Sequence, residues 1–390
     1  MLGIPDHAAF AGHGHAAPAF AASGELELKS FQWARRPFNA ARYLDAAARE
    51  HRTLRVLTDA PVVELREREN ARSVEAAIVV RPDGTPLRVE ADFFVIAAGG
   101  IETPRLLLNS TAVRPGGIGN DRDTVGRYLS THPKANMATL VLSRALSTRH
   151  PLFTDHAMPG GVMRCGLGFT AQAQRAHRLL NHYVQVLPFA EYRANRLFES
   201  VRGSERFNSP LIDRSPLIAG YLTGAGKIAF EMIGRAGRLQ PRTGKFVLRA
   251  FLDQHPDPRH RIALSEKRDA RGMRLANVAW RFSPGDRASV VRFFERLAAT
   301  TTGAARLDFG RLVELEDWPL IGMHSHFMGT TRMGSDPAVS VTDAHGRVHG
   351  SENLFIAGPS LFTTPGYANP VYTVVALSLR LADHLARLAR

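Results

Sequence analysis

The last 65 residues of the chain, 326–390, read HFMGTTRMGSDPAVSVTDAHGRVHGSENLFIAGPSLFTTPGYANPVYTVVALSLRLADHLARLAR. In order, they contain a histidine, a glycine-rich turn, a strand-like run, an Asn-Pro pair and a long apolar helix pattern. This order is suited to placing a base and a hydrogen-bonding amide beside a cofactor, because imidazole accepts protons near neutral pH. The candidate base is His326 and the candidate amide is Asn369.

The same stretch predicts a strand and a helix. Residues 353–358 (NLFIAG) predict a buried strand that ends in Ala357-Gly358, a small pair that lets a cofactor approach the backbone. A helix is predicted from Val371, with Pro370 in its first turn and positive potential at its N terminus. Its apolar residues predict a side that faces the core: Val375, Leu377, Leu379, Leu381, Leu385 and Leu388.

A second informative region is 91–110. Ala91–Ala98 is a continuous apolar run, which predicts a buried central strand ending at Gly99-Gly100. A helix is predicted over 102–110, with Pro104 in its first turn. A strand, a glycine pair and a helix N terminus together favour anion binding, although the pattern is common in α/β folds.

The remaining sequence divides into two regions with different patterns of predicted helices and strands. Residues 38–49 predict a helix with Asn39 as N-cap, and 54–57, 62–66 and 74–80 predict strands, with an Asp83-Gly84 hairpin turn after the last. Between 134 and 313, strand-like runs alternate with helical stretches, which predicts an antiparallel sheet with helices on one side. The predicted strands are 137–142, 183–187, 246–254, 261–264 and 275–280, and the predicted helices are 171–180 and 286–299.

Three segments together resemble one enzyme family. AAGGIETPRLLLNS (97–110), VGRYLSTHP (125–133) and residues 320–387 resemble the glucose–methanol–choline (GMC) oxidoreductases, which are flavin enzymes that oxidise alcohols. The resemblance implies an α/β plus α+β fold: an incomplete three-layer domain like those that bind FAD or NAD(P), and an antiparallel-sheet substrate domain. The implied domains are 1–133 (partial FAD-binding, with 1–30 interpreted as a flexible arm), 134–313 (substrate-binding) and 314–390 (the C-terminal part of the FAD-binding domain).

The resemblance also implies a chemistry. An FAD-dependent member oxidises a CH–OH group of a small alcohol or sugar, with hydride transfer to flavin N5, His326 as base and Asn369 on the substrate oxygen. The helix end at residue 371 faces the flavin ring. The implied cofactor-binding residues are Val63, Ala98, Gly99, Gly100, Ala357, Gly358, Asn369, Pro370 and Val371.

Other residues invite a role and have a simpler interpretation. His324 is a candidate supporting residue beside the base, and Asn369 is also a candidate N-cap. His132, followed by Pro133, is better explained as a loop histidine than as a catalytic one. His7, His13 and His15 are interpreted as residues of a flexible arm, so no metal site is predicted there. Cys165 is interpreted as a small buried residue.

One expected motif is absent from the sequence. FAD enzymes of this type open with a strand, G-x-G-x-x-G and a helix, and Gly12-His13-Gly14-His15 does not match that spacing. Three explanations stay open. The chain is a fragment; it is one half of a split enzyme whose partner chain supplies the nucleotide-binding segment; or it is an inactive paralogue that acts as a binding or partner subunit.

Bulk composition narrows the classes of protein. The net charge is +14, but the arginines are spread along the chain and interleaved with acids, so no nucleic-acid surface is predicted. No run of 18 apolar residues and no signal peptide are seen, which predicts a cytoplasmic protein without a membrane span. The electron acceptor cannot be predicted from these residues.

Overall fold

A computed structural model describes most of the chain. The described residues are 20, 24–34, 38–51, 53–147, 152–158, 161–189, 242–303, 305–309, 320–321 and 326–390. The chain divides into two compact units. Unit 1 comprises 1–38, 134–251 and 289–321, and unit 2 comprises 39–133, 252–288 and 322–390. The division into domains at residues 133 and 313 stays a prediction.

Unit 1 is built on one antiparallel sheet of eight strands. The strands are β1 (Leu26–Ala34), β6 (Lys134–Ser147), β7 (His156–Met158), β8 (Gly161–Phe169), β9 (Tyr183–Pro188), β10 (Arg242–Phe251), β13 (Ala305–Asp308) and β14 (Leu320–Ile321). Their order is β1-β8-β9-β10-β6-β13, with β14 also on β6 and β7 on β8. The predicted antiparallel sheet is confirmed for the runs 137–142, 183–187 and 246–254, but the runs 261–264 and 275–280 form a separate hairpin of unit 2. Residues 26–30, interpreted as part of a flexible arm, are a strand of this sheet, because they pair with β8.

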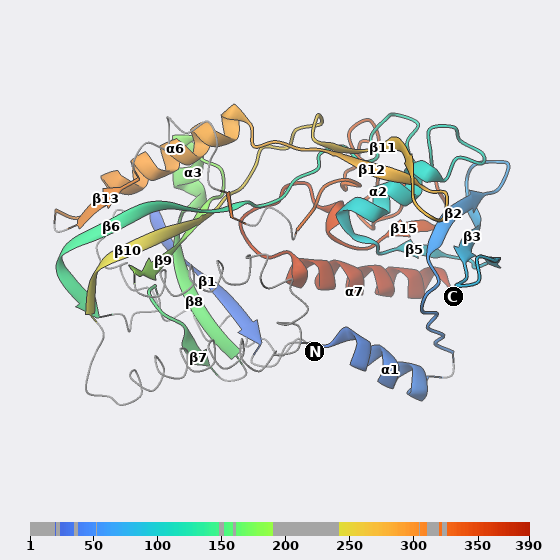
Figure 1. Cartoon of the computed structure of the whole chain (residues 1–390), viewed down its shortest axis with the longest axis horizontal. Helices are drawn as coiled ribbons and strands as arrows, with labels where there is room; N and C mark the ends of the chain where they lie inside the picture. The colour runs from blue at the N-terminus through green and yellow to red at the C-terminus, as the bar shows by residue number, and fades with distance from the viewer. Residues whose placement is uncertain are drawn as a thin grey trace, which may run out of the picture. The chain divides into compact units, whose positions relative to one another are not determined.

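Helices cover one face of this sheet (Figure 1). Helix α3 (Ala171–His177) begins at Thr170, whose side chain accepts a hydrogen bond from the Ala173 N–H. Helix α6 (Pro284–Ala299) enters unit 1 at Ser289. Phe293 of α6 is fully buried and meets Phe169 of β8 edge to face, with ring centroids 5.1 Å apart. The predicted helices at 171–180 and 286–299 are thus present.

Unit 2 combines three small sheets with helices. Its elements are α1 (Ala40–Glu50), β2 (Val62–Glu67), β3 (Val74–Val80), β4 (Pro86–Val89), β5 (Phe94–Ile96), α2 (Gly99–Asn109), β11 (Arg261–Arg268), β12 (Arg274–Ala279), β15 (Leu354–Ile356), η3 (Pro359–Leu361) and α7 (Val371–Leu388). The strands β2-β3-β4 form an antiparallel sheet, β11 and β12 form a hairpin, and β5 and β15 pair in parallel.

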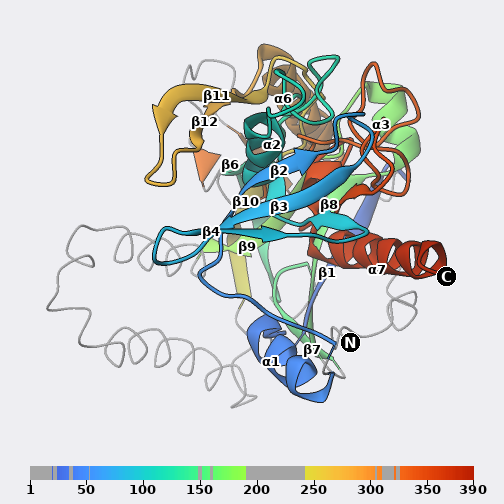
Figure 2. The same cartoon turned by 90° about the vertical axis from the view of Figure 1, so that its right-hand side faces the viewer.

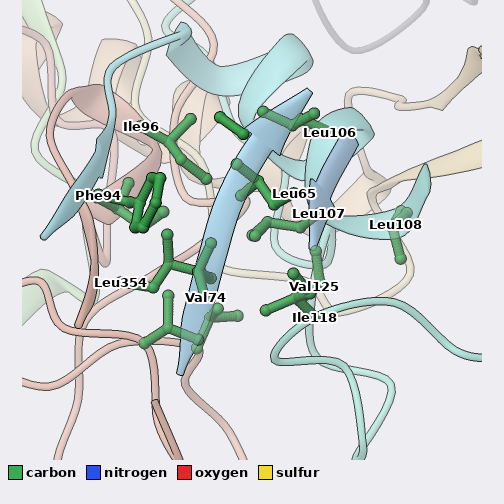
Figure 3. Close-up of a cluster of buried hydrophobic side chains, with 14 of the residues drawn as sticks. Leu65, Val74, Phe94, Ile96, Leu106, Leu107, Leu108, Ile118, Val125 and Leu354 are labelled. Carbon is green, nitrogen blue, oxygen red and sulfur yellow. The ribbon is translucent and has the colours of Figure 1, made fainter. Parts of the chain in front are cut away.

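The core of unit 2 lies between α2, β5, β15 and the β2-β3 pair. Leu106 and Leu107 of α2 point at Leu65 of β2, and Phe94 and Leu354 meet on the parallel pair (Figure 3). These side chains are at most 8% exposed. Burying each such side chain stabilises the fold by about 1.5–3 kcal/mol, so this cluster contributes substantially to the stability of the elements around it.

Several predicted elements differ from the structure. Residues 54–57 were predicted as a strand but are exposed and not in a strand, because periodicity alone says nothing about a pairing partner. The run 91–98 predicted a strand buried on both faces, but β5 covers three residues and Val95 is 45% exposed. Helix α2 begins at Gly99 rather than at Glu102, so Pro104 lies inside it.

Helix α7 is the largest departure from expectation. Its apolar residues predicted a core-facing side, yet Leu381 is its one buried residue, and Leu379 and Leu388 are each 49% exposed. Helix α1 buries no residue at all, although Asn39 caps it as predicted by accepting from the Arg42 N–H. In Figure 2, α7 lies at the side of unit 2, and α1 stands apart from the sheets of that unit. None of the helices in the described ranges has the length and apolarity of a membrane span.

Candidate active site

His326 lies two residues before Met328, which forms an antiparallel bridge with Ser130. Ser130 and Met328 exchange two backbone hydrogen bonds, of 3.0 and 2.9 Å, in an antiparallel bridge. In an antiparallel pair, stepping two residues in opposite directions along the two strands reaches another opposed pair on the same face. The bridge therefore sets His132 opposite His326.

The two histidines are in contact. Nε2 of His132 and Nδ1 of His326 are within hydrogen-bonding distance, and the rings meet edge to face with centroids 4.7 Å apart. His132 is 3% exposed and His326 is half-buried. Because a ring nitrogen is either donor or acceptor, this contact couples the proton positions of the two rings.

The turn after His326 is pinned on two sides. The Thr331 N–H donates to Ser360 O at 2.9 Å, and its hydroxyl donates to Ser360 Oγ at 2.7 Å. Gly329 N donates to Pro359 O at 3.3 Å. The segment is thus fixed to η3, which directly follows β15.

On its other side the turn is fastened to the N terminus of α2. Pro104 has no N–H, so it cannot bond the carbonyl of Gly100 four residues earlier. The hydroxyl of Thr330, itself fully buried, donates to that carbonyl at 2.7 Å instead. At Gly100 the two segments approach so closely that a Cβ on this residue would lie 2.2 Å from Phe327 O. Proline inside α2 is therefore tolerated because Thr330 replaces the missing donor.

Residues 252–254 connect the histidines to the loop before α7. Gln254 Oε1 accepts from the Thr131 N–H at 3.2 Å and from Trp280 Nε1 at 2.9 Å, and the Leu252 N–H donates to Pro133 O at 2.9 Å. The neighbouring Asp253 accepts from the Gly366 N–H at 3.0 Å. One short segment thus holds both His132 and the loop that leads to Asn369.

Four of the nine expected cofactor-binding residues lie at one edge of the parallel pair: Ala98, Gly99, Ala357 and Gly358. Because β5 and β15 run in the same direction, the residues after both strands lie at the same edge, which is where open α/β sheets bind ligands. Ala98 is exposed there, and Gly99 and Gly358 have φ of 79° and 129° with no heavy atom within 4 Å of a built Cβ. Ala357 is joined to β5 through Ile96 O.

This edge fits a flat or extended cofactor. The two glycines have backbone conformations that a side chain would strain, and the space above them is open, so a ligand can touch the backbone. The N terminus of α2 also lies here, with free N–H groups and no side-chain cap among the described residues. By contrast, Gly100 is packed against Phe327, and Val63 of β2 packs partly buried against the hydrophobic core.

The start of α7 is open. Val371 is 59% exposed, the Asn369 side chain is exposed, and no side-chain hydrogen bond from a described residue caps the helix. The cap position belongs to Pro370, so the interpretation of Asn369 as N-cap and of Pro370 as a first-turn residue is wrong. The first helical bond, from Val374 N to Pro370 O, starts one residue later than Asn369.

A groove of about 570 Å³ lies elsewhere in unit 2, along residues 255–259 and 283–285. Two of its lining residues belong to a helix cap: Ser283 exchanges side-chain and backbone hydrogen bonds with Asp286, and His255 Nδ1 lies 2.9 Å from Asp286 Oδ1. Burial raises the pKa of Asp286, but the hydrogen bonds from His255 and Ser283 outweigh it and leave the pKa below its usual value. The arrangement explains how α6 begins and contains none of the expected site residues.

The structure thus brings His326 together with His132, and it gathers Ala98, Gly99, Ala357 and Gly358 at one edge. Asn369 lies on a separate loop that reaches the histidines through Asp253 and Gln254. Sequence analysis undervalued His132, whose only signal was the pairing register of two segments almost 200 residues apart. His324, like His7, His13 and His15, lies outside the described residues.

Comparison with known sequences points in one direction. The family model described as GMC oxidoreductase, C-terminal part, matches residues 256–378, and its N-terminal counterpart matches 20–134. The chain is 30% identical to the fructose dehydrogenase large subunit of Gluconobacter japonicus over 328 residues, which is 83% of this chain and 52% of that protein.

Two further relatives match this chain over a similar share of both sequences. A 2-methyl-1,2-propanediol dehydrogenase of Mycolicibacterium austroafricanum is 27% identical over 83% of this chain and 53% of its own length. A 6'''-hydroxyparomomycin C oxidase of Streptomyces lividus is 27% identical over 82% of this chain and 50% of its own length. The chain therefore spans about half the length of these relatives.

Among solved structures, the fold is similar to that of pyridoxine 4-oxidase from Mesorbium loti, with a TM-score of 0.50 and 19% sequence identity. The match covers 87% of this chain and 60% of that one. It supports a mixed α/β fold with antiparallel sheets.

Proposed function

Because this chain belongs to the GMC oxidoreductase family, we propose that it carries the proton-transfer half of an FAD-dependent enzyme that oxidises the CH–OH group of an alcohol or a sugar. The observation that carries the proposal is the construction around His326. A histidine in the position where the family has its base is half-buried, held on a paired segment and hydrogen-bonded through Nδ1. We assign Nε2 as the nitrogen that meets the substrate.

The chemistry asks for a base that is fixed and neutral. An alcohol holds its hydroxyl proton tightly, and removing that proton makes loss of hydride from the same carbon easier. His326 would take the proton at Nε2. Asn369, which cannot act as a base, would donate its amide N–H to the substrate oxygen.

The fit of FAD is supported by the open edge formed by Ala98, Gly99, Ala357 and Gly358. FAD, when bound, supplies the acceptor for the hydride at N5 of its ring. The N terminus of α2 suits the pyrophosphate, and the N terminus of α7, with Pro370 and Val371, would direct its positive potential at the ring. Gly100 and Val63 would shape this edge from behind rather than touch the cofactor.

We further propose that the ADP portion of FAD is held by a segment outside this sequence, on the same polypeptide or on a partner chain. Three observations support it. The chain spans only about half the length of its relatives. In the described part of the chain, β5 pairs with β15 alone, and α7 and α1 keep apolar residues exposed. A parallel strand laid on β5 and a cover on α7 would remove these exposed surfaces.

The test is the visible spectrum of the purified protein, with and without added FAD, followed by reduction with a panel of sugars and short diols under anaerobic conditions. Flavin absorbance that bleaches with at least one substrate is the expected result. A matched pair of variants locates the cofactor: Gly358→Val should abolish FAD uptake, whereas Gly272→Val, at an exposed hairpin turn with similar open space and φ of 84°, should not.

A protein that takes up no FAD, even when co-expressed with the upstream half of a longer relative, would contradict the proposal. Uptake of FAD only in that co-expression would support the segment outside this sequence.

A further inference from the structure

His132 is a buried residue of unit 2 that contacts the proposed base. It is 3% exposed, it follows directly on the bridge between Ser130 and Met328, and its Nε2 meets Nδ1 of His326. A histidine that served only to fill space would not need a nitrogen directed at the ring of the expected base.

The position of one proton decides what this contact does. If His132 donates from Nε2, then Nδ1 of neutral His326 is the acceptor and its proton sits on Nε2, where it blocks proton uptake. If His326 donates from Nδ1, then His132 accepts at Nε2, and Nε2 of neutral His326 carries a lone pair instead of a proton. Only the second arrangement makes His326 a base.

We propose that His132 is a positioning residue that holds His326 in the Nδ1–H tautomer. The proposal rests on the function proposed above, since it gives His132 meaning only if His326 removes a proton. When the substrate proton arrives at Nε2, His326 becomes an imidazolium whose Nδ1–H still donates to His132. His132 keeps its own proton throughout, and the pair gains one positive charge in all.

The surroundings hold His132 in place for this task. The Thr131 N–H donates to Gln254, and Pro133 O accepts from the Leu252 N–H, so the backbone on both sides of the ring is fixed. Gln254 is itself 1% exposed and also accepts from Trp280. The backbone that carries His132 is therefore fixed on both sides, as is required of a residue that orients a general base.

The first measurement is the tautomer itself. Two-bond ¹⁵N–¹H correlation spectra of ¹⁵N-histidine-labelled protein, recorded above pH 8 without substrate, distinguish Nδ1–H from Nε2–H rings. We expect the Nδ1–H pattern for His326, assigned by its loss in His326→Gln. An Nε2–H pattern for His326 in the unmodified protein would overturn the proposal.

Two variants then separate orientation from packing. His132→Phe fills the space without an acceptor, so His326 should lose the Nδ1–H pattern, and kcat should fall on the order of 100-fold with KM changed less than about threefold. His132→Gln keeps a carbonyl acceptor and should restore the pattern and most of kcat. Equal losses in both variants, with the tautomer unchanged, would refute the role; His132→Met replaces the Phe variant if that one fails to fold.

The control is His182→Phe, a buried histidine of unit 1 that lies 3.1 Å from the Ser289 hydroxyl. It should lower stability without changing the His326 signal. The spectra do not need FAD or turnover. A further outcome is a protein without alcohol-oxidising activity in which His326 still has an Nδ1–H tautomer that depends on His132. That result would contradict the proposed function, but it would still support the role of His132 in orienting His326.

Discussion

The segment 326–331 is bonded on several sides to the rest of unit 2, whereas helix α7, which follows it in the sequence, leaves most of its apolar side chains half-buried or exposed. Residues 328–331 are buried and bonded to η3, to α2 and to Ser130. Helix α7 buries Leu381, and its His384 ring stacks on the ring of His345, with ring centroids 4.2 Å apart. The segment that carries the proposed base is thus bonded on several sides within unit 2, whereas the helix proposed to face the flavin keeps exposed apolar residues.

The largest expected effect is on the segment 326–331 of this comparison. His326→Gln should lower kcat/KM of the FAD-loaded protein by about 10²- to 10⁴-fold, because a general base is lost while the fold is kept. His349→Gln, at a histidine that bonds Ser340, is the control and should stay within threefold. Steady-state kinetics decide; a His326→Gln enzyme of near-normal rate would mean that another group takes the proton.

A pair of adjacent glycines tests how tightly the segment 326–331 is packed. Gly100→Ala should lower the free energy of unfolding by about 3 kcal/mol, since its Cβ would collide with Phe327 O. Gly99→Ala has open space and only its φ of 79° to oppose it, so about 1 kcal/mol is expected. Urea denaturation measures both. Equal costs would show that the turn yields easily.

The corresponding pair on α7 tests its openness. Leu381→Ala should cost about 2 kcal/mol, as a buried leucine does, and Leu379→Ala less than about 0.5 kcal/mol, because that side chain is half exposed. The same denaturation experiment applies. A cost at Leu379 as large as that at Leu381 would mean that this side of α7 is already covered.

Thr330→Val probes the bond that links the segment 326–331 to α2. It leaves the carbonyl of Gly100 without its donor, and about 1–2 kcal/mol of stability should be lost. Thr330→Ser keeps the hydroxyl and should recover most of that loss. If valine were as stable as threonine, water would have to reach this carbonyl.

The smallest effect concerns the attachment of α7. Burial, then the neighbouring His345 and Arg387, lower the pKa of His384 below 6.5. The unfolded chain therefore takes up this proton first as pH falls, so the folded state loses stability below about pH 6.5 and regains it above. Exposed charges are screened, and on the order of 0.3 kcal/mol is expected. His384→Gln should remove this share of the difference in unfolding free energy between pH 7.5 and 5.5.

Local signals predicted the elements that local chemistry builds. Asn39 caps α1 as expected, and the strand-like runs at 183–187 and 261–264 are strands. The start of α2 was misplaced because Pro104 is normally a first-turn residue, and its tolerance depends on Thr330, more than 200 residues away. His132 was undervalued for the same reason: its role follows from a pairing register.

Apolar spacing misled most on α7. The pattern correctly predicted a helix with one apolar side. It does not say whether another part of this chain covers that side. The strand at 54–57 failed for want of a partner. Where an apolar run finds no neighbour in unit 2, the mismatch itself marks the surface at which the proposed additional segment would lie.

The parallel pair of β5 and β15 also dictates an order of events during synthesis. Phe94 and Leu354 are neighbours across the pair but 260 positions apart in the chain (354 minus 94). Closing so long a loop is slow and costs entropy before any contact offsets it. On the ribosome, unit 2 must wait for this late strand, while every strand of unit 1 has already been translated. Its sheet can therefore form first, and the edge that would bind the cofactor is among the last features of the molecule to appear.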